Sequence, residues 1–426
     1  MKKISLKKIF LFAFLFRLIF AFWIWHPDLN NHIDWGIRFW DYGAKGFYAP
    51  ESNVWNYTWP NQPPGTIIIF AFIYKLFKFI FSFFWFLNIK IPLFPSLVML
   101  FLEDRLYPAL LQLPAILSDL GMAYLIYKIL VKWKNVQTAR FGAILFLFNP
   151  IIWYNSAVWG QTDATVNFFG LLALYFLLNK KLTKSLLAIA ISLYIKVSLA
   201  IFLPLFAIVI VRQRHKVINI VKSLSFPVLI ILGVTLFFST KVDPATWLYN
   251  IYTKKVLTEQ LQVITANAFN LWAALTGIHE QPHILKLGPL SYQYWGMVLT
   301  GLVLAPIFWK LWRNQDKENI FWSFVLLAFS VWMFKTNMHE RYLYPLFPYL
   351  TILVARDRKL LPIYWSLSGI NLLNLYNFWW VPKVDLLVGF LSFGNRVMPR
   401  ILGLINLVIF VYLARSRRLF HPNDVS

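Results

Sequence analysis

Some charged residues of this chain occur where a charge is costly. Lys196 lies inside the apolar stretch "SLYIKVSLAIFLP", far from the basic clusters on either side of it. A lysine at such a depth in a membrane cannot easily reach the surface, so it needs a buried anion as partner. That anion is either the phosphate of a lipid or an acidic side chain of another helix, and the sequence leaves both open.

The stretch "KTNMHERYLYPLFP" places a second group of charges at the end of an apolar run. His339, Glu340 and Arg341 stand together there, and the helix-breaking Pro345 follows. Such a group can bind a phosphate, relay a proton or cap a helix. The chemistry of the three side chains does not choose among these roles.

Two further stretches have polar residues where apolar runs end. "NPIIWYNSAVWGQTDA" (149–164) contains Gln161 and Asp163, and this acid is also suited to cap the following helix. "HIDWGIRFWDYG" carries Asp34 and Asp41 on a Trp- and Phe-rich stretch that is typical of an amphipathic interfacial helix. For both of these acids the alternative is an ordinary solvated carboxylate, and for Asp41 we favour it.

Several common catalytic patterns are missing from the sequence. It contains no Gly-rich phosphate loop, no Ser-His-Asp order, no HExxH and no DxD pair. This argues against a nucleotide-sugar enzyme and against the usual hydrolase and zinc mechanisms. The chain has no cysteine, so disulfides and thiol ligands are excluded.

The composition is that of an integral membrane protein. Of the 426 residues, 59% are hydrophobic and only 14% are charged, a balance unlike that of soluble domains. Apolar runs of about 20 residues recur, the length a helix needs to cross a hydrocarbon core of roughly 30 Å. Because long alternating patterns are missing, we predict an all-α fold rather than a barrel.

The net charge of +24 indicates topology rather than nucleic-acid binding. The basic residues gather in short loops between apolar runs, as they do on the cytoplasmic side of membrane proteins. The N-terminal apolar run is too long for a signal peptide and no small-residue cleavage site follows, so we expect a retained first helix. The basic clusters are "KKISLKK" at the start, "KWK", "KKLTK", "RQRHK", "KLWRNQDK", "RDRK" and "RSRR".

The topology that follows is a single domain, 1–426, with about 12 transmembrane helices and both termini in the cytoplasm. Residues 27–63 form the first extracytoplasmic loop, residues 241–291 a second large outer loop, and residues 415–426 a cytoplasmic tail. In this topology, residues 64–104 cannot cross the membrane an odd number of times. We expect that segment to be re-entrant, to lie along the interface or to cross twice, and Lys75 and Lys78 suit an interfacial helix.

Several stretches, in order, resemble the motifs of one superfamily. They are "HIDW", "NQPPGTIIIF" with Pro63 and Pro64, "NPIIWYNSAVWGQTDA", Lys196 with Pro204, "NAFNLWAALTG" and "HER". Together they resemble GT-C glycosyltransferases that use polyprenyl-phosphate sugars. The similar groups are the dolichyl-phosphate-glucose-dependent glucosyltransferases and the prokaryotic relatives of the second mannosyltransferase of GPI-anchor assembly. "WGQTDA" departs from the glucosyltransferase signature, which favours mannose over glucose.

The resemblance implies a GT-C fold and an inverting hexosyltransferase whose active site lies outside the cytoplasm, in the plasma membrane. Asp34 then takes the role of catalytic base. We expect the donor phosphate to be bound by Lys196, Arg341 and His339. Sugar and acceptor hydroxyls would contact four further residues: Asp163, Gln161, Glu340 and Asp41.

The expected substrates are a polyprenyl-phosphate sugar donor and a glycolipid, glycan or protein acceptor, in contact with membrane lipid and without nucleic acid. No cofactor and no metal is expected, since the leaving group carries a single phosphate. The main alternative is a transporter or flippase of lipid-linked sugars, which would usually have repeated halves and broken helices at the midplane. We find no such repeat in the sequence. A non-catalytic scaffold or channel is the third possibility.

Overall fold

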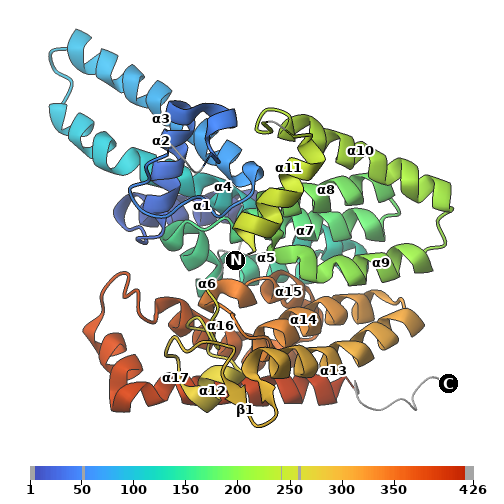
Figure 1. Cartoon of the computed structure of the whole chain (residues 1–426). Coiled ribbons are helices and arrows are strands. Elements are labelled where there is room, and N and C mark those ends of the chain that lie inside the picture. Colours follow the sequence, from blue (N-terminus) through green and yellow to red (C-terminus); the bar gives the residue numbers. More distant parts are fainter. Residues whose placement is uncertain (1–4, 50–52, 241, 258–260, 418–426) are drawn as a thin grey trace.

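The computed structural model describes residues 5–49, 53–240, 242–257 and 261–417. This part of the chain is almost entirely helical, which confirms the all-α prediction. The one sheet in it is a two-stranded antiparallel pair, β1 (Lys286–Leu287) and β2 (Leu290–Ser291). The helices form two layers: the first eleven lie in the upper half of Figure 1, and α12 to α17 make up the lower half.

The described elements of the upper layer run from residue 6 to residue 256. Its elements are α1 (Leu6–Trp23), α2 (Leu29–Gly46), α3 (Pro64–Lys90), α4 (Ser96–Trp133), α5 (Val136–Leu147), α6 (Pro150–Tyr154), the π-helix η1 (Asn155–Trp159), α7 (Asp163–Leu178), α8 (Leu182–Ile195), the 3-10 helix η2 (Val197–Phe202), α9 (Leu203–Arg212), α10 (Val217–Thr235), α11 (Pro244–Ile251) and the π-helix η3 (Tyr252–Val256).

The lower layer contains the "HER" segment. Its elements are α12 (Leu271–Thr276), the strand pair, α13 (Tyr292–Arg313), α14 (Lys317–Phe334), the 3-10 helix η4 (Glu340–Leu343), α15 (Leu346–Arg356), the 3-10 helix η5 (Arg358–Leu360), α16 (Leu361–Tyr376) and α17 (Asp385–Ser416). Most of α14 and α15 is buried. These two helices pack on α5, α4 and η2 and so join the layers.

Residues 27–63, which we expect to form the first outer loop, contain the amphipathic helix α2. On α2, the buried residues Leu29, His32, Trp35 and Gly36 recur at helical spacing, whereas Asp41 on the other side is exposed. The buried side packs on α3 and α4. The loop therefore carries a helix that is fixed against the body of the protein.

Residues 64–104 form an antiparallel pair made of α3 and the first part of α4, and this pair extends beyond the rest of the upper layer (Figure 1). Pro64 begins α3, as its fixed φ favours at a first helical position. Both helices are long and apolar enough to cross a membrane. The out-and-back path is the one that the doubly crossing alternative requires, and the position of this pair relative to the bilayer stays a prediction.

Fewer continuous spans are present than the sequence suggested. By length and composition, five helices of the described residues can cross a membrane, or six when the pair of helices at 136–147 and 150–159, bent by 46°, counts as one. The expected number of about 12 is higher because several apolar runs are broken. The run that contains Lys196, for example, is divided into α8, η2 and α9. Such breaks place backbone and polar side chains where a continuous helix would have none.

Candidate functional site

The charges that the sequence singled out meet at the junction of the two layers. Lys196 Nζ lies 2.8 Å from Asp163 Oδ1. Arg341 Nη1 lies 2.8 Å from Glu340 Oε1 and 3.8 Å from Asp28 Oδ2, and its Nε lies 3.9 Å from Asp163 Oδ2. Three carboxyl groups and two cations thus form one connected cluster. Asp28, Asp163 and Lys196 come from the upper layer, and the other two come from η4.

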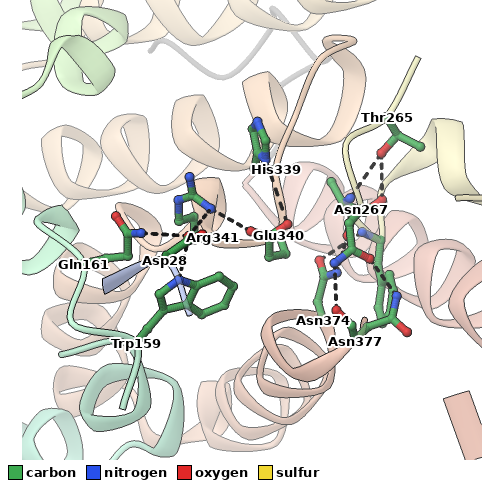
Figure 2. A network of polar contacts seen from close by, with 12 residues as sticks. Asp28, Trp159, Gln161, Thr265, Asn267, His339, Glu340, Arg341, Asn374 and Asn377 are labelled. Atoms are coloured by element: carbon green, nitrogen blue, oxygen red, sulfur yellow. Dashed lines mark hydrogen bonds and ion pairs between the residues drawn. The ribbon is translucent and has the colours of Figure 1, made fainter. Parts of the chain in front are cut away.

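Asp28 is held by two donors, one at the end of η1 and one in the turn that follows it. Trp159 Nε1 and Gln161 Nε2 donate to Asp28 Oδ2 at 3.0 and 3.1 Å (Figure 2). Burial by itself would raise the pKa of Asp28, but Arg341, His26 and the Trp159 hydrogen bond outweigh it and lower that pKa. Asp28 therefore stands in the cluster as an ionised carboxylate.

Three histidines surround this carboxylate in neutral form. Burial, with Arg341 close by, lowers the pKa of His26 to about 3, that of His32 to about 4 and that of His339 to about 3. His26 Nδ1 accepts a hydrogen bond of 3.0 Å from the backbone N–H of Asp28, so its proton is on Nε2. The buried Nε2 has no hydrogen-bond partner among the described residues. It is a donor available to a ligand.

Two facing atoms of the cluster are also buried without a hydrogen bond. They are Arg341 Nε and Asp163 Oδ2, which lie 3.9 Å apart and have no hydrogen-bond partner within the described chain. Buried polar atoms normally have one. The site therefore offers both a cationic donor and an anionic acceptor to a bound molecule.

The π-helix and a left-handed glycine aim Trp159 and Gln161 at Asp28. The carbonyl of Asn155 accepts from the N–H groups of both Gly160 and Gln161, which ends η1 in a tight turn. Gly160 has φ +71°, and a Cβ there would lie 2.7 Å from Leu29 Cδ1. Glycine is needed both for this backbone conformation and for the close approach to the start of α2.

The break after α8 positions Lys196. Here α3 begins against the end of α8: Thr66 Oγ1 donates to the carbonyl of Ile195 at 2.5 Å. A Cβ on Gly65 would lie 2.5 Å from the carbonyl oxygen of Tyr194, so only glycine permits this contact. The Pro63–Pro64 stretch thus starts a helix whose first turn supports the lysine.

The start of the "NAFNLWAALTG" stretch and the helix α14 hold the "HER" segment in place. The N–H of Ala266 donates to the carbonyl of Met338 at 3.0 Å, and Trp332 Nε1 donates to the carbonyl of His339 at 3.0 Å. Asn267, whose φ is +65°, is fixed in turn by hydrogen bonds with Asn374 and Asn377, drawn in Figure 2. Lower-layer contacts therefore set the position of η4.

Beneath the cluster lies a buried ion pair that our sequence analysis missed. Arg17 Nε lies 3.1 Å from Asp119 Oδ2, and both side chains are fully buried. Ser156 and Tyr344 donate to the same carboxylate at 2.6 and 2.9 Å. The pair connects α1 and α4 to the segments just before Trp159 and just after Arg341. A lone charge inside an apolar run, the criterion that found Lys196, would have found both residues.

Four of the predicted site residues belong to the cluster, and Gln161 and His339 lie beside it. His339 Nδ1 is 4.0 Å from Glu340 Oε2. Lys196 has the acid of another helix as its partner, which was the alternative to a lipid phosphate. Asp163 is in the first turn of α7, but its carboxylate does not cap that helix. The four predicted residues in the cluster are Lys196, Arg341, Asp163 and Glu340.

Asp34 and Asp41 have their partners outside the cluster. The Asp34 carboxylate is 3% exposed and accepts two hydrogen bonds of 2.9 Å from the backbone and side chain of Asn56, with Arg38 at 3.5 Å. These contacts fasten the first outer loop to α2. Asp41 pairs with Arg38 at 3.3 Å on the exposed side of the helix, as the solvated alternative predicts. The carboxylate that reaches the cluster from this loop is Asp28.

One comparison with known proteins gives a match. The family model described as "GPI transamidase subunit PIG-U" matches residues 87–281, less than half of the chain. The matched part includes Asp163 and Lys196 but neither Asp28 nor Arg341. No curated protein matches. The chain is thus similar over this part to a membrane protein family, and the finer resemblance to mannosyltransferases stays a prediction.

Proposed function

We propose that the protein transfers one hexose, with mannose favoured, from a polyprenyl-phosphate sugar to an acceptor hydroxyl, with inversion at the anomeric carbon. The observation that carries this proposal is the meeting of an ionised carboxylate, Asp28, with the cations Arg341 and Lys196 in one buried cluster. A phosphate-linked sugar is already activated. Its transfer needs a base for the acceptor and positive charge for the departing phosphate.

In the proposed step, the acceptor oxygen attacks the anomeric carbon as Asp28 takes the hydroxyl proton. The bond between that carbon and the phosphate oxygen breaks, and the bonding pair leaves with the lipid phosphate. The added negative charge develops near Arg341 and Lys196, which stabilise it. Neutral His26 supplies an Nε2–H donor without adding charge. No metal ion is required for this sequence of events.

The charges of the cluster limit how a phosphate can enter. Three carboxyl groups stand against two cations, so an incoming phosphate has to replace a carboxylate contact. The 3.9 Å contact between Arg341 Nε and Asp163 Oδ2 is the one best suited to open, since no hydrogen bond is lost. Asp163 would then accept from a sugar hydroxyl. Gln161 stays with Asp28, which it orients.

A second candidate function comes from the family match. A chain similar to a GPI transamidase subunit could bind a phosphate-containing glycolipid for another protein without breaking a glycosidic bond. The same cations would hold the phosphate in that case. The two candidates differ in one measurable respect, which is the formation of a new glycosidic bond.

The test is a transfer assay with radiolabelled polyprenyl-phosphate mannose and membranes that contain the protein. We expect acid-stable labelled product with the wild type and about 10²–10⁴-fold less with Asp28→Asn, the usual cost of removing a general base. Asp41→Asn, on the exposed side of α2, is the matched control and should leave transfer unchanged. Full activity of Asp28→Asn would show that Asp28 is not the general base. Retention of labelled lipid with no transfer in any variant would favour the binding subunit.

A further inference from the structure

A basic cavity lies far from the cluster, where the α7–α8 connection meets the α9–α10 connection. Its volume is about 460 Å³, and its lining includes Lys180, Lys181, Lys184, Lys222 and His215. None of the described residues that line it is acidic. None of the four lysines forms an ion pair within the described chain. The cavity thus concentrates positive charge that the protein itself does not neutralise.

A second cavity near the basic clusters differs, because its positive charge is neutralised by an acidic residue. It has a volume of about 390 Å³ and lies at the α13–α14 connection, where Arg356 and Arg417 line it. Both arginines bind the carboxylate of Glu318, at 3.0 and 2.8 Å. Its cations therefore have an internal anion. The first cavity has none among the residues described.

The walls of the basic cavity are tied together, and one of them begins a helix with an exposed apolar surface. Thr183 Oγ1 donates to Ser223 Oγ at 2.9 Å, which links the start of α8 to α10. α10 runs from this cavity along the edge of the upper layer (Figure 1). Only Pro227 and Thr235 of this apolar helix are buried. Val221 and Leu229 on it are 56% and 68% exposed. Hydrocarbon chains would cover this helix in a bilayer.

We propose that this cavity binds the phosphate headgroup of an anionic membrane lipid whose acyl chains lie along α10. Clustered lysines at the membrane surface attract anionic headgroups, with each lysine contributing about 1 kcal/mol. The hydroxyl of Ser223, which accepts from Thr183, adds a neutral donor for a phosphate oxygen. The site is independent of the proposed transferase cluster, and it lies on the side that the basic clusters predict to be cytoplasmic.

The test is native mass spectrometry of the full chain in detergent, titrated with dioleoyl phosphatidylglycerol. Dioleoyl phosphatidylcholine serves as the zwitterionic control and inorganic phosphate as the headgroup without chains. The variant Lys181→Gln/Lys184→Gln/Lys222→Gln removes three lining lysines. The matched control Lys7→Gln/Lys8→Gln/Lys134→Gln removes three exposed lysines on the same predicted side.

We expect phosphatidylglycerol to bind the wild type and the control variant alike, and the cavity variant about 100-fold more weakly. If both variants bound phosphatidylglycerol equally weakly, the lipid would be attracted diffusely by surface lysines, and the proposed binding site would be wrong. Equal binding of phosphatidylcholine would do the same. If inorganic phosphate bound as tightly as the lipid, the site would be one for free phosphate and the lipid assignment would fail. Thermal unfolding of each variant excludes misfolding as the cause.

Discussion

The Lys196–Asp163 pair allows a structural role to be separated from a functional one. Removing one partner of a buried ion pair costs about 3–5 kcal/mol, because the other charge is left without compensation. The side chains here are 9% and 6% exposed, so solvent screens the pair little. In Lys196→Met, Arg341 Nε at 3.9 Å remains near Asp163, which places the expected loss near the lower end, about 3 kcal/mol.

The double variant Lys196→Met/Asp163→Asn should recover most of that stability. It removes both charges at once, so neither charge is left without its partner in the interior. Transfer should not recover, since the positive charge for the phosphate is still missing. Loss of one such stabilising group costs about 10²–10³-fold in rate.

The free energy of unfolding would be measured by denaturant titration in mixed micelles, and transfer by the labelled-mannose assay at saturating donor. Asp41→Asn again serves as control. The reasoning is refuted if the double variant regains stability and transfer together, because Lys196 would then act only as the structural partner of Asp163. It is also refuted if Lys196→Met loses no stability.

Further predictions concern the supports of the site. Gly160→Ala should lower the free energy of unfolding by about 1–3 kcal/mol and reduce transfer, because φ is +71° and the new Cβ would meet Leu29; thermal unfolding and the transfer assay check this. Arg17→Met should cost about 3–5 kcal/mol, and Arg17→Met/Asp119→Leu clearly less, measured in the same denaturant titration. The pKa of His26 is about 3 in the folded protein and 6.5 in the unfolded chain. Neutral His26 therefore contributes fully to stability above pH 6.5. That contribution is lost as the pH falls from 6.5 towards 3, by up to about 1.4 kcal/mol per pH unit. His26→Gln should flatten that part of the stability–pH curve, and an unchanged slope would contradict the neutral assignment.

The cationic part of the site could be predicted from the sequence, and for a clear reason. Lys196 and Arg341 stand in apolar surroundings where a charge needs a partner, so their position in the sequence already indicates a buried cluster. The free-energy cost of an unpaired charge in apolar surroundings also explains why Asp163 lies next to both cations. The helical class was equally predictable, since runs of apolar residues leave few alternatives to helices in a membrane.

The carboxylate of the first outer loop could not be chosen in this way. Asp28 precedes α2 directly, where an aspartate ordinarily caps a helix, yet its side chain makes no such bond and binds Trp159 and Gln161. The resemblance of "HIDW" to a motif of the superfamily points to Asp34 instead. Its partner Asn56 is 22 residues further on, in a loop whose path local patterns do not define.

The origin of the cluster in both layers has a consequence for biosynthesis. Asp28, Asp163 and Lys196 are made well before Arg341, so a nascent chain holds two acids and one cation at this place until the lower layer arrives. Burying the surplus acid in lipid during that interval is unfavourable. We therefore expect insertion to finish only when the segment between α14 and α15 has left the ribosome. Chains truncated before residue 340 should be recognised and degraded by membrane proteases even though their hydrophobic helices are intact.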